Sequence, residues 1–357
     1  MRQKSAFLTA FFMCIGIAWF LPHSVRAKVQ NQFCGNCHSM HNSQDGETVI
    51  DDAQRHLLGQ DCIGCHTGRN DGTSATPYVY DLDEPTYGSN TLAGGNFYWV
   101  ATDGEGNDTK GHNVLGLSAQ DQNIPAAMPG GGAPGGTTSC ANSCHLTLAA
   151  EQTAIPEFGS GCEGCHLDVR HHADDPTDTV VGEDDGWYRF LAGHNSGAGS
   201  GVEGIEDNDW EYTNSAADHN EYLGFVGTHT AGAGFHNLGN TMTAYCCGCH
   251  KNFHIQDDSG LWIRHPSDVV LPNEGEYSLY TTYSTEAPVA RPDLSSYTGP
   301  SATVTPGIDL VMCLSCHRAH GSPYPDMLRW DYDRQIAGGG GDDGTGCFTC
   351  HSAKDDS

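Results

Sequence analysis

The sequence predicts a mostly irregular fold, with short α-helices at repeated cysteine motifs and only minor β elements between them. Three observations predict it. Glycine supplies 46 of the 357 residues, apolar residues are only 37% of the chain, and 16 cysteines accompany 20 histidines. Globular chains rarely combine so many thiols and imidazoles, and no amphipathic helical period is sustained along the chain. Something other than aliphatic side chains must therefore fill the interior.

Residues 1–27 have the layout of a secretory signal peptide. Arg2 and Lys4 form a basic start, residues 6–21 are mostly apolar, and residues 25–27 (Val-Arg-Ala) supply a cleavage site. A single-pass anchor is the alternative, but the apolar run is short for a span and ends at Pro22. We expect residues 28–357 to be one exported domain without a clear internal boundary or membrane segment.

The charge is strongly acidic, at −29 with histidine neutral. Removing the leader takes away three basic residues and no acidic one, which lowers −29 by three, to −32. Nucleic-acid and anionic lipid surfaces attract basic patches, so this balance disfavours both as partners. It favours solubility by repulsion, or contact with cationic partners.

Seven short motifs use 14 of the 15 cysteines that follow the leader and leave only Cys247. Six are C-x-x-C-H and one, at residues 140–145, has an extra residue between the thiols. The motif residues are Cys34, Cys37 and His38; Cys62, Cys65 and His66; Cys140, Cys144 and His145; Cys162, Cys165 and His166; Cys246, Cys249 and His250; Cys313, Cys316 and His317; and Cys347, Cys350 and His351.

C-x-x-C-H is the attachment signature of c-type haem. The two thiols add to the vinyl groups of one haem, and the next residue, histidine, becomes the proximal iron ligand. Disulfides, zinc sites and iron–sulfur clusters are the alternatives, but none of them needs a histidine directly after each second cysteine. We therefore predict seven covalent haems. About 330 mature residues cannot enclose seven haems separately, so the haems should pack on one another and form much of the core.

Twelve further histidines are available for the opposite, distal faces of the seven irons. A histidine three or four residues after a motif histidine is carried beside that haem and can reach a neighbouring iron. Other histidines are favoured as ligands because a neighbouring Gly allows close approach to the haem or a neighbouring Pro holds the turn rigid. His171 and His172 are adjacent, so we expect one of them to ligate and prefer His172. The preferred distal set is His41, His56, His112, His172, His219, His254, His265 and His320. Irons ligated by two histidines exchange electrons with little rearrangement and bind no substrate.

The long insertions between motifs carry aromatic residues. Residues 96–101 (Asn-Phe-Tyr-Trp-Val-Ala) read as a plausible strand, and residues 277–283 are also strand-like. Gly-rich loops are expected at residues 129–136 and 337–346.

The run from Cys313 to Ser322, followed by Cys347 to His351, resembles the doubled CXXCH repeat of multihaem cytochromes, and Cys34 to His41 is similar. The resemblance implies electron transfer in the periplasm or at the cell exterior, to other redox proteins or extracellular acceptors, with head-to-tail polymerisation in some relatives. The alternative is a multihaem oxidoreductase acting on nitrite, hydroxylamine or sulfur oxyanions. That enzyme needs one open iron, which pentahaem nitrite reductases commonly mark with C-x-x-C-K; here every pair is followed by His.

Overall fold

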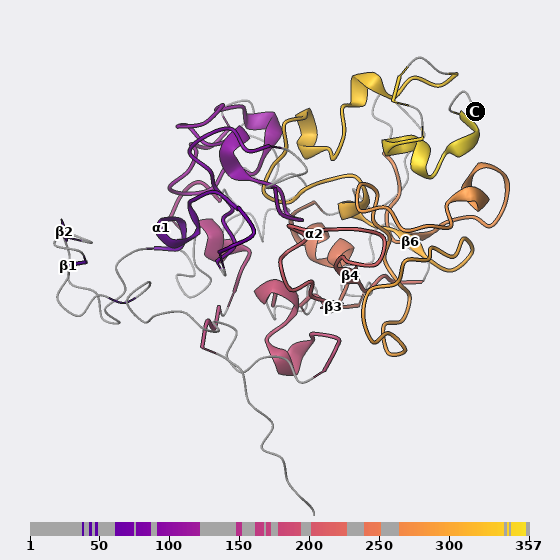
Figure 1. The fold of residues 1–357 in the computed structure, drawn as a ribbon, viewed down its shortest axis with the longest axis horizontal. Helices are drawn as coiled ribbons and strands as arrows, with labels where there is room; N and C mark the ends of the chain where they lie inside the picture. Colours follow the sequence, from indigo (N-terminus) through magenta and orange to yellow (C-terminus); the bar gives the residue numbers. More distant parts are fainter. Residues whose placement is uncertain are drawn as a thin grey trace, which may run out of the picture.

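The computed structural model describes residues 38, 43–44, 47–48, 61–74, 76–86, 91–121, 148–151, 161–167, 169–172, 178–193, 201–226, 239–250, 264–338, 341–342 and 344–354. The expected leader at residues 1–27 lies outside them. Figure 1 shows the described chain running from residues near 60 at one side of the view to the C-terminal residues at the other.

Regular structure is sparse and local. Among the described residues, the α-helices are α1 (Cys62–His66) and α2 (Met242–His250). The same residues contain three antiparallel pairs of two-residue strands: β1 (Ser43–Gln44) with β2 (Glu47–Thr48), β3 (Gly204–Ile205) with β4 (Glu221–Tyr222), and β5 (Val269–Val270) with β6 (Leu310–Val311). The 3₁₀ helices are η2 (Phe97–Trp99), η3 (Asp108–Lys110), η5 (Gly161–Gly164), η6 (Glu183–Asp185), η7 (Tyr188–Phe190), η10 (Gly275–Leu279), η11 (Cys313–Ser315), η12 (Pro325–Met327), η13 (Tyr332–Arg334), η14 (Gly346–Thr349) and η15 (Ser352–Lys354). This confirms the predicted fold class.

The apolar core is divided into small clusters, each beside a cysteine motif. Cys162 packs against the first cluster, Cys246 against the second and Cys350 against the third. The buried members are Tyr80, Phe97, Val100, Ala101, Val114 and Leu117 in the first; Tyr188, Leu191, Val202, Tyr222, Met242, Ala290, Leu310 and Met312 in the second; and Leu271, Tyr280, Tyr283, Val289, Val304 and Val311 in the third. Folding therefore brings the motifs to the edges of the apolar clusters.

The two expected strands in the insertions are not formed. In residues 96–101 the Asn96 side chain accepts a hydrogen bond from the Tyr98 N–H at 2.9 Å, which caps the 3₁₀ helix η2. Phe97 and Trp99 are both buried, so a short run of apolar residues fills the core without forming a strand. In residues 277–283 the chain begins in η10, and only Thr282 makes a β-bridge, to Thr303.

A buried ionic network ties β4 to the segments that follow it. The Arg291 guanidinium, 1% exposed, donates to Glu221 at 2.8 and 3.1 Å and to Asp309 at 2.6 Å. It also donates to the carbonyls of Ser301 and Thr303, at 3.1 and 2.9 Å. Five hydrogen bonds to one side chain hold together a region that has only two-residue strands.

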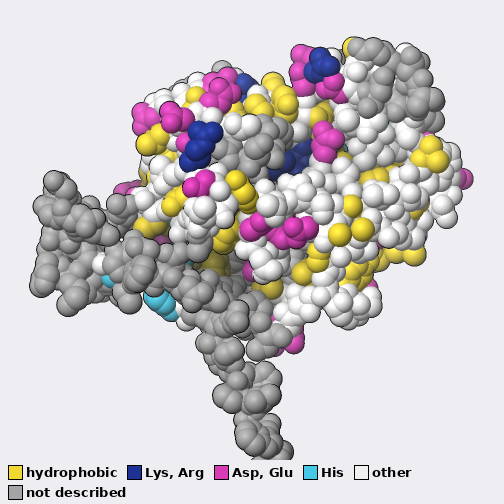
Figure 2. Space-filling model, in the orientation of Figure 1, with side chains coloured by type: hydrophobic (Ala, Val, Ile, Leu, Met, Phe, Trp, Pro, Cys, Tyr) yellow, Lys and Arg dark blue, Asp and Glu magenta, His cyan; other side chains and the backbone are white. Residues whose placement is uncertain are grey.

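The surface follows the acidic composition. In Figure 2 Asp and Glu side chains are spread over the visible face among few Lys or Arg. In the part of the chain that is described, no helix has both the length and the hydrophobicity of a membrane span.

Candidate haem sites

We number the motifs one to seven in chain order. Motifs four, six and seven each close one helical turn, because the backbone N–H of the motif histidine reaches the carbonyl of the first cysteine four residues earlier, whereas motif five ends the longer helix α2. The distances are 2.9 Å for His166 to Cys162, 3.1 Å for His317 to Cys313 and 3.0 Å for His351 to Cys347. At motif two, the Asp61 carboxylate caps α1 by accepting from the Gly64 N–H at 2.9 Å. One turn therefore carries both thiols and the imidazole.

Three of the motif histidines are oriented by hydrogen bonds from Nδ1 to backbone carbonyls. His66 contacts the Pro77 carbonyl at 2.8 Å and His166 the Arg189 carbonyl at 2.9 Å. His317 contacts the Asp326 carbonyl at 2.8 Å. A carbonyl only accepts, so Nδ1 carries the proton and Nε2 keeps its lone pair for a metal.

Five motif histidines lie opposite a second imidazole at nearly the same spacing. The ring centres are 6.1 Å apart for His38 and His172, 6.2 Å for His66 and His171, 6.2 Å for His166 and His320, 6.1 Å for His250 and His112, and 6.3 Å for His351 and His265. An imidazole–metal bond is about 2.0–2.1 Å, so two imidazoles on opposite sides of one ion have ring centres about 6 Å apart. The pairs fit bis-histidine haem.

The second histidines are also oriented for ligation. His112 Nδ1 contacts the Ala319 carbonyl at 2.7 Å, and His265 Nδ1 contacts the Pro266 carbonyl at 2.8 Å. Burial keeps several of these rings neutral, as metal ligands must be: it lowers the pKa of His250 to about 4 and that of His320 to about 3. Burial also lowers the pKa of His112, His166, His171 and His317.

Several motifs lie next to each other in space through their cysteines. The Cys62 side chain of motif two adjoins Cys162 of motif four, and Cys246 of motif five adjoins Cys313 of motif six. The Tyr245 hydroxyl, beside motif five, donates to the Cys165 carbonyl of motif four at 2.6 Å. Consecutive residues join motifs one and two, since His172 faces His38 and His171 faces His66.

His171 is the residue that sequence reasoning left out. The sequence predicts one ligand from the adjacent pair, with His172 preferred, whereas the structure places each of them opposite a different motif histidine. Side chains of adjacent residues point in different directions. Two consecutive histidines could therefore have been predicted to serve two neighbouring sites rather than one.

His219 differs from its predicted role of iron ligand. It is fully buried and stacks on Tyr283, with ring centres 3.5 Å apart and planes at 11°. Its Nδ1 contacts the Ser215 carbonyl at 3.2 Å and its Nε2 contacts Glu221 at 3.3 Å. Both nitrogens are engaged next to Arg291, so the ring serves the buried ionic network.

The remaining predicted residues lie outside the described part. They are Cys34, Cys37, Cys140, Cys144, His41, His56, His145 and His254, and the side chain of Cys249 is likewise not described.

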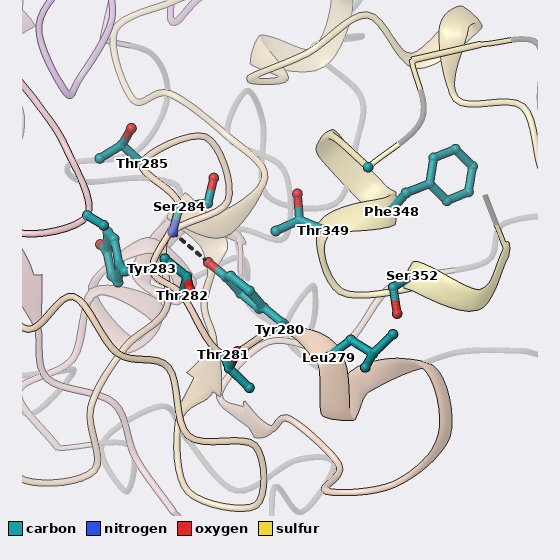
Figure 3. Close-up of a pocket in the computed structure, with 12 residues that line it drawn as sticks. Leu279, Tyr280, Thr281, Thr282, Tyr283, Ser284, Thr285, Phe348, Thr349 and Ser352 are labelled. Carbon is teal, nitrogen blue, oxygen red and sulfur yellow. Dashed lines mark hydrogen bonds between the residues drawn. The ribbon is translucent and has the colours of Figure 1, made fainter. Parts of the chain in front are cut away.

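A cavity of about 550 Å³ lies beside motif seven. Figure 3 shows Thr349 and Ser352 on one side and residues 279–285 on the other, with the Phe348 ring directed away from residues 279–285. The Tyr280 hydroxyl accepts from the Ser284 N–H at 3.2 Å. The lining includes the two residues between the motif cysteines but neither Cys347, Cys350 nor His351. It therefore adjoins the seventh site without containing its attaching or ligating groups.

Comparison with known proteins bears on these sites. A family described as the doubled CXXCH motif matches residues 308–356, which contain motifs six and seven. C-type cytochrome OmcS of Geobacter sulfurreducens is 24% identical over 369 aligned residues, covering 84% of this chain and 78% of that protein. Two solved structures are similar. The outer membrane cytochrome S filament of G. sulfurreducens has 19% identity and a TM-score of 0.44 over 86% of this chain and 85% of that one. The OmcS nanowire has 22% identity and a TM-score of 0.37, covering 83% of each chain.

Proposed function

We propose that this chain, a multihaem c-type cytochrome, carries electrons along seven covalently attached, bis-histidine haems in the periplasm or at the cell exterior, as a carrier rather than an enzyme. The observation that carries the proposal is the set of five imidazole pairs with ring centres 6.1–6.3 Å apart. Two histidines per iron leave no position for a substrate, which is the arrangement expected of a carrier.

Each residue type has a distinct task. The motif cysteines would hold haem c by covalent attachment, and the paired imidazoles would supply two iron ligands at each such site. The backbone carbonyls of Pro77, Arg189 and Asp326 fix the rings of three motif histidines. Haem c, when bound, supplies a one-electron iron couple. Rigid ligation limits the rearrangement that each electron transfer requires.

The contacts between motifs support a continuous order of sites. We infer the sequence one, two, four, five, six and seven. His171 and His172 join one to two, and the Cys62–Cys162 contact joins two to four. Tyr245 joins four to five, and the Cys246–Cys313 contact joins five to six. Sites six and seven follow each other closely in sequence, and a charge on Cys350 raises the pKa of Cys316 after the larger effect of burial.

The second histidine of site six can be proposed by analogy with site four. His320, three residues after the motif-six histidine, lies opposite His166 of motif four. By the same logic we propose that His254, four residues after His250, serves the iron of His317, because motifs five and six touch. Site three is then the one site without an assigned second histidine, and we propose that His41 or His56 supplies it.

The haem count is tested by the intact mass of the secreted protein. We expect the processed chain plus seven haem masses, because seven complete motifs are present. A six-haem mass, with the peptide of residues 140–145 unmodified, would show that the motif with the longer spacing is empty.

We also propose that the subunits assemble head to tail. The similar solved structures are a filament and nanowires of G. sulfurreducens cytochromes. In this chain His172 of site one and His265 of site seven, at the two ends of the inferred order, are both exposed. A heterologous interface joining these ends would extend the path from one subunit to the next.

The net charge, −29 for the whole chain and three lower without the expected leader, opposes such contacts, so we expect assembly to increase with salt or divalent cations. Sedimentation at several protein and cation concentrations measures this. A single species near the monomer mass throughout contradicts assembly and leaves the carrier function intact.

A further inference from the structure

The motif-seven histidine has a different partner from three of its counterparts. His66, His166 and His317 direct Nδ1 to backbone carbonyls at 2.8–2.9 Å. His351 Nδ1 instead lies 3.3 Å from the carboxylate oxygen Oε1 of Glu276. The contact is longer and less well aligned than the carbonyl bonds, but it places a full negative charge beside the ring.

The chain holds this carboxylate in place. Glu276 lies in η10, which packs on η15 immediately after motif seven. The Ser352 hydroxyl donates to the Glu276 carbonyl at 2.5 Å, and the Tyr277 ring packs against His351 with centres 5.1 Å apart. The Glu276 side chain is only 16% exposed. Lys354 Nζ lies 3.3 Å from the same Oε1 and partly offsets its charge.

A carboxylate on the outer nitrogen of a ligating imidazole makes that imidazole a stronger donor. A stronger donor and a nearby negative charge both favour the ferric over the ferrous ion. A carbonyl offers a dipole only, so its effect is smaller. In a partly buried site the charge is incompletely screened by water.

We propose that Glu276 is a positioning residue that lowers the reduction potential of site seven relative to the same site with a neutral partner on His351. The inference rests on the proposed function, in which motif seven holds a haem. An electron on this terminal site is thereby destabilised and passes more readily to the neighbouring site.

The test is a spectroelectrochemical titration of the purified, fully haem-loaded protein and its variants. Glu276→Gln should shift the reduction equilibrium of one haem upward about tenfold, which for one electron is about 59 mV. Glu274→Gln is the matched control, because it removes the same charge from an exposed residue two positions away. Glu276→Asp keeps the charge and should retain most of the lowered potential. Lys354→Gln should shift the same haem downward.

An unchanged titration for Glu276→Gln, or an equal shift for Glu274→Gln, overturns the inference. The mass of the peptide carrying Cys347 and Cys350 separates this from failure of the proposed function. If that peptide carries haem and Glu276→Gln does not shift the potential, only the role of Glu276 is rejected. Haem missing from that peptide in the natural protein removes both.

Discussion

Replacing Arg291 with methionine is expected to lower the free energy of unfolding by about 3–5 kcal/mol, the range for removing one partner of a buried ion pair. Methionine fills much of the same volume but leaves Glu221 and Asp309 buried without their cation. It also removes the donors to the Ser301 and Thr303 carbonyls. Denaturant titration of the haem-loaded protein measures the change.

The matched control is Arg334→Met. Arg334 makes two contacts to Asp342, at 2.8 and 2.5 Å, but the pair is solvent-exposed. We expect little change in unfolding free energy, because water and salt screen exposed pairs. Equal losses in the two variants would contradict the importance given to the buried network.

The loss caused by Arg291→Met should also depend on pH. Bonds to His219 and Arg291 hold the pKa of Glu221 below its usual 4.5, although burial alone would raise it. A carboxyl with a lowered folded pKa contributes stability above its unfolded pKa and loses it as pH falls through the folded pKa. The difference between the natural protein and the variant should therefore shrink below about pH 4.5.

Replacing His320 with alanine is expected to convert one iron per chain from low spin to high spin. His320 lies opposite His166 at 6.2 Å, so its removal opens one axial position at site four. Electron paramagnetic resonance of the oxidised protein measures the spin state. Carbon monoxide should then bind one reduced iron in the variant and none in the natural protein.

His219→Ala is the control for this experiment, because His219 is buried but faces Tyr283 and Glu221. Every iron should stay low-spin in that variant even if its stability falls. A high-spin signal from His219→Ala, or an entirely low-spin spectrum from His320→Ala, would contradict the assignment of ligands.

The sequence predicts the local chemistry well because that chemistry is confined to single turns of chain. Two thiols and an imidazole within five residues need only one helical turn, as α1 at Cys62–His66 shows. The sparse regular structure also follows from composition, since a Gly-rich chain with few aliphatic residues has little with which to build sheets.

Long-range placement is harder to predict, as three cases show. Residues 96–101 have strand-like composition, but the Asn96 cap and burial of Phe97 and Trp99 select a 3₁₀ helix. His219 was predicted to ligate iron, but its contacts with Glu221 and Tyr283, which are not evident from the local sequence, place it in the buried ionic network. His171 faces a motif histidine more than 100 residues earlier, so no local pattern specifies which partner it meets.

A cryo-EM map of the purified protein tests the central claim most directly, because it locates the irons relative to the histidines. We predict an iron between the rings of each pair: His38 with His172, His66 with His171, His112 with His250, His166 with His320, and His265 with His351. We also predict that the sites follow one another in the order inferred from the thiol and tyrosine contacts. An iron with an open axial position, or paired histidines with no iron between them, would contradict the account.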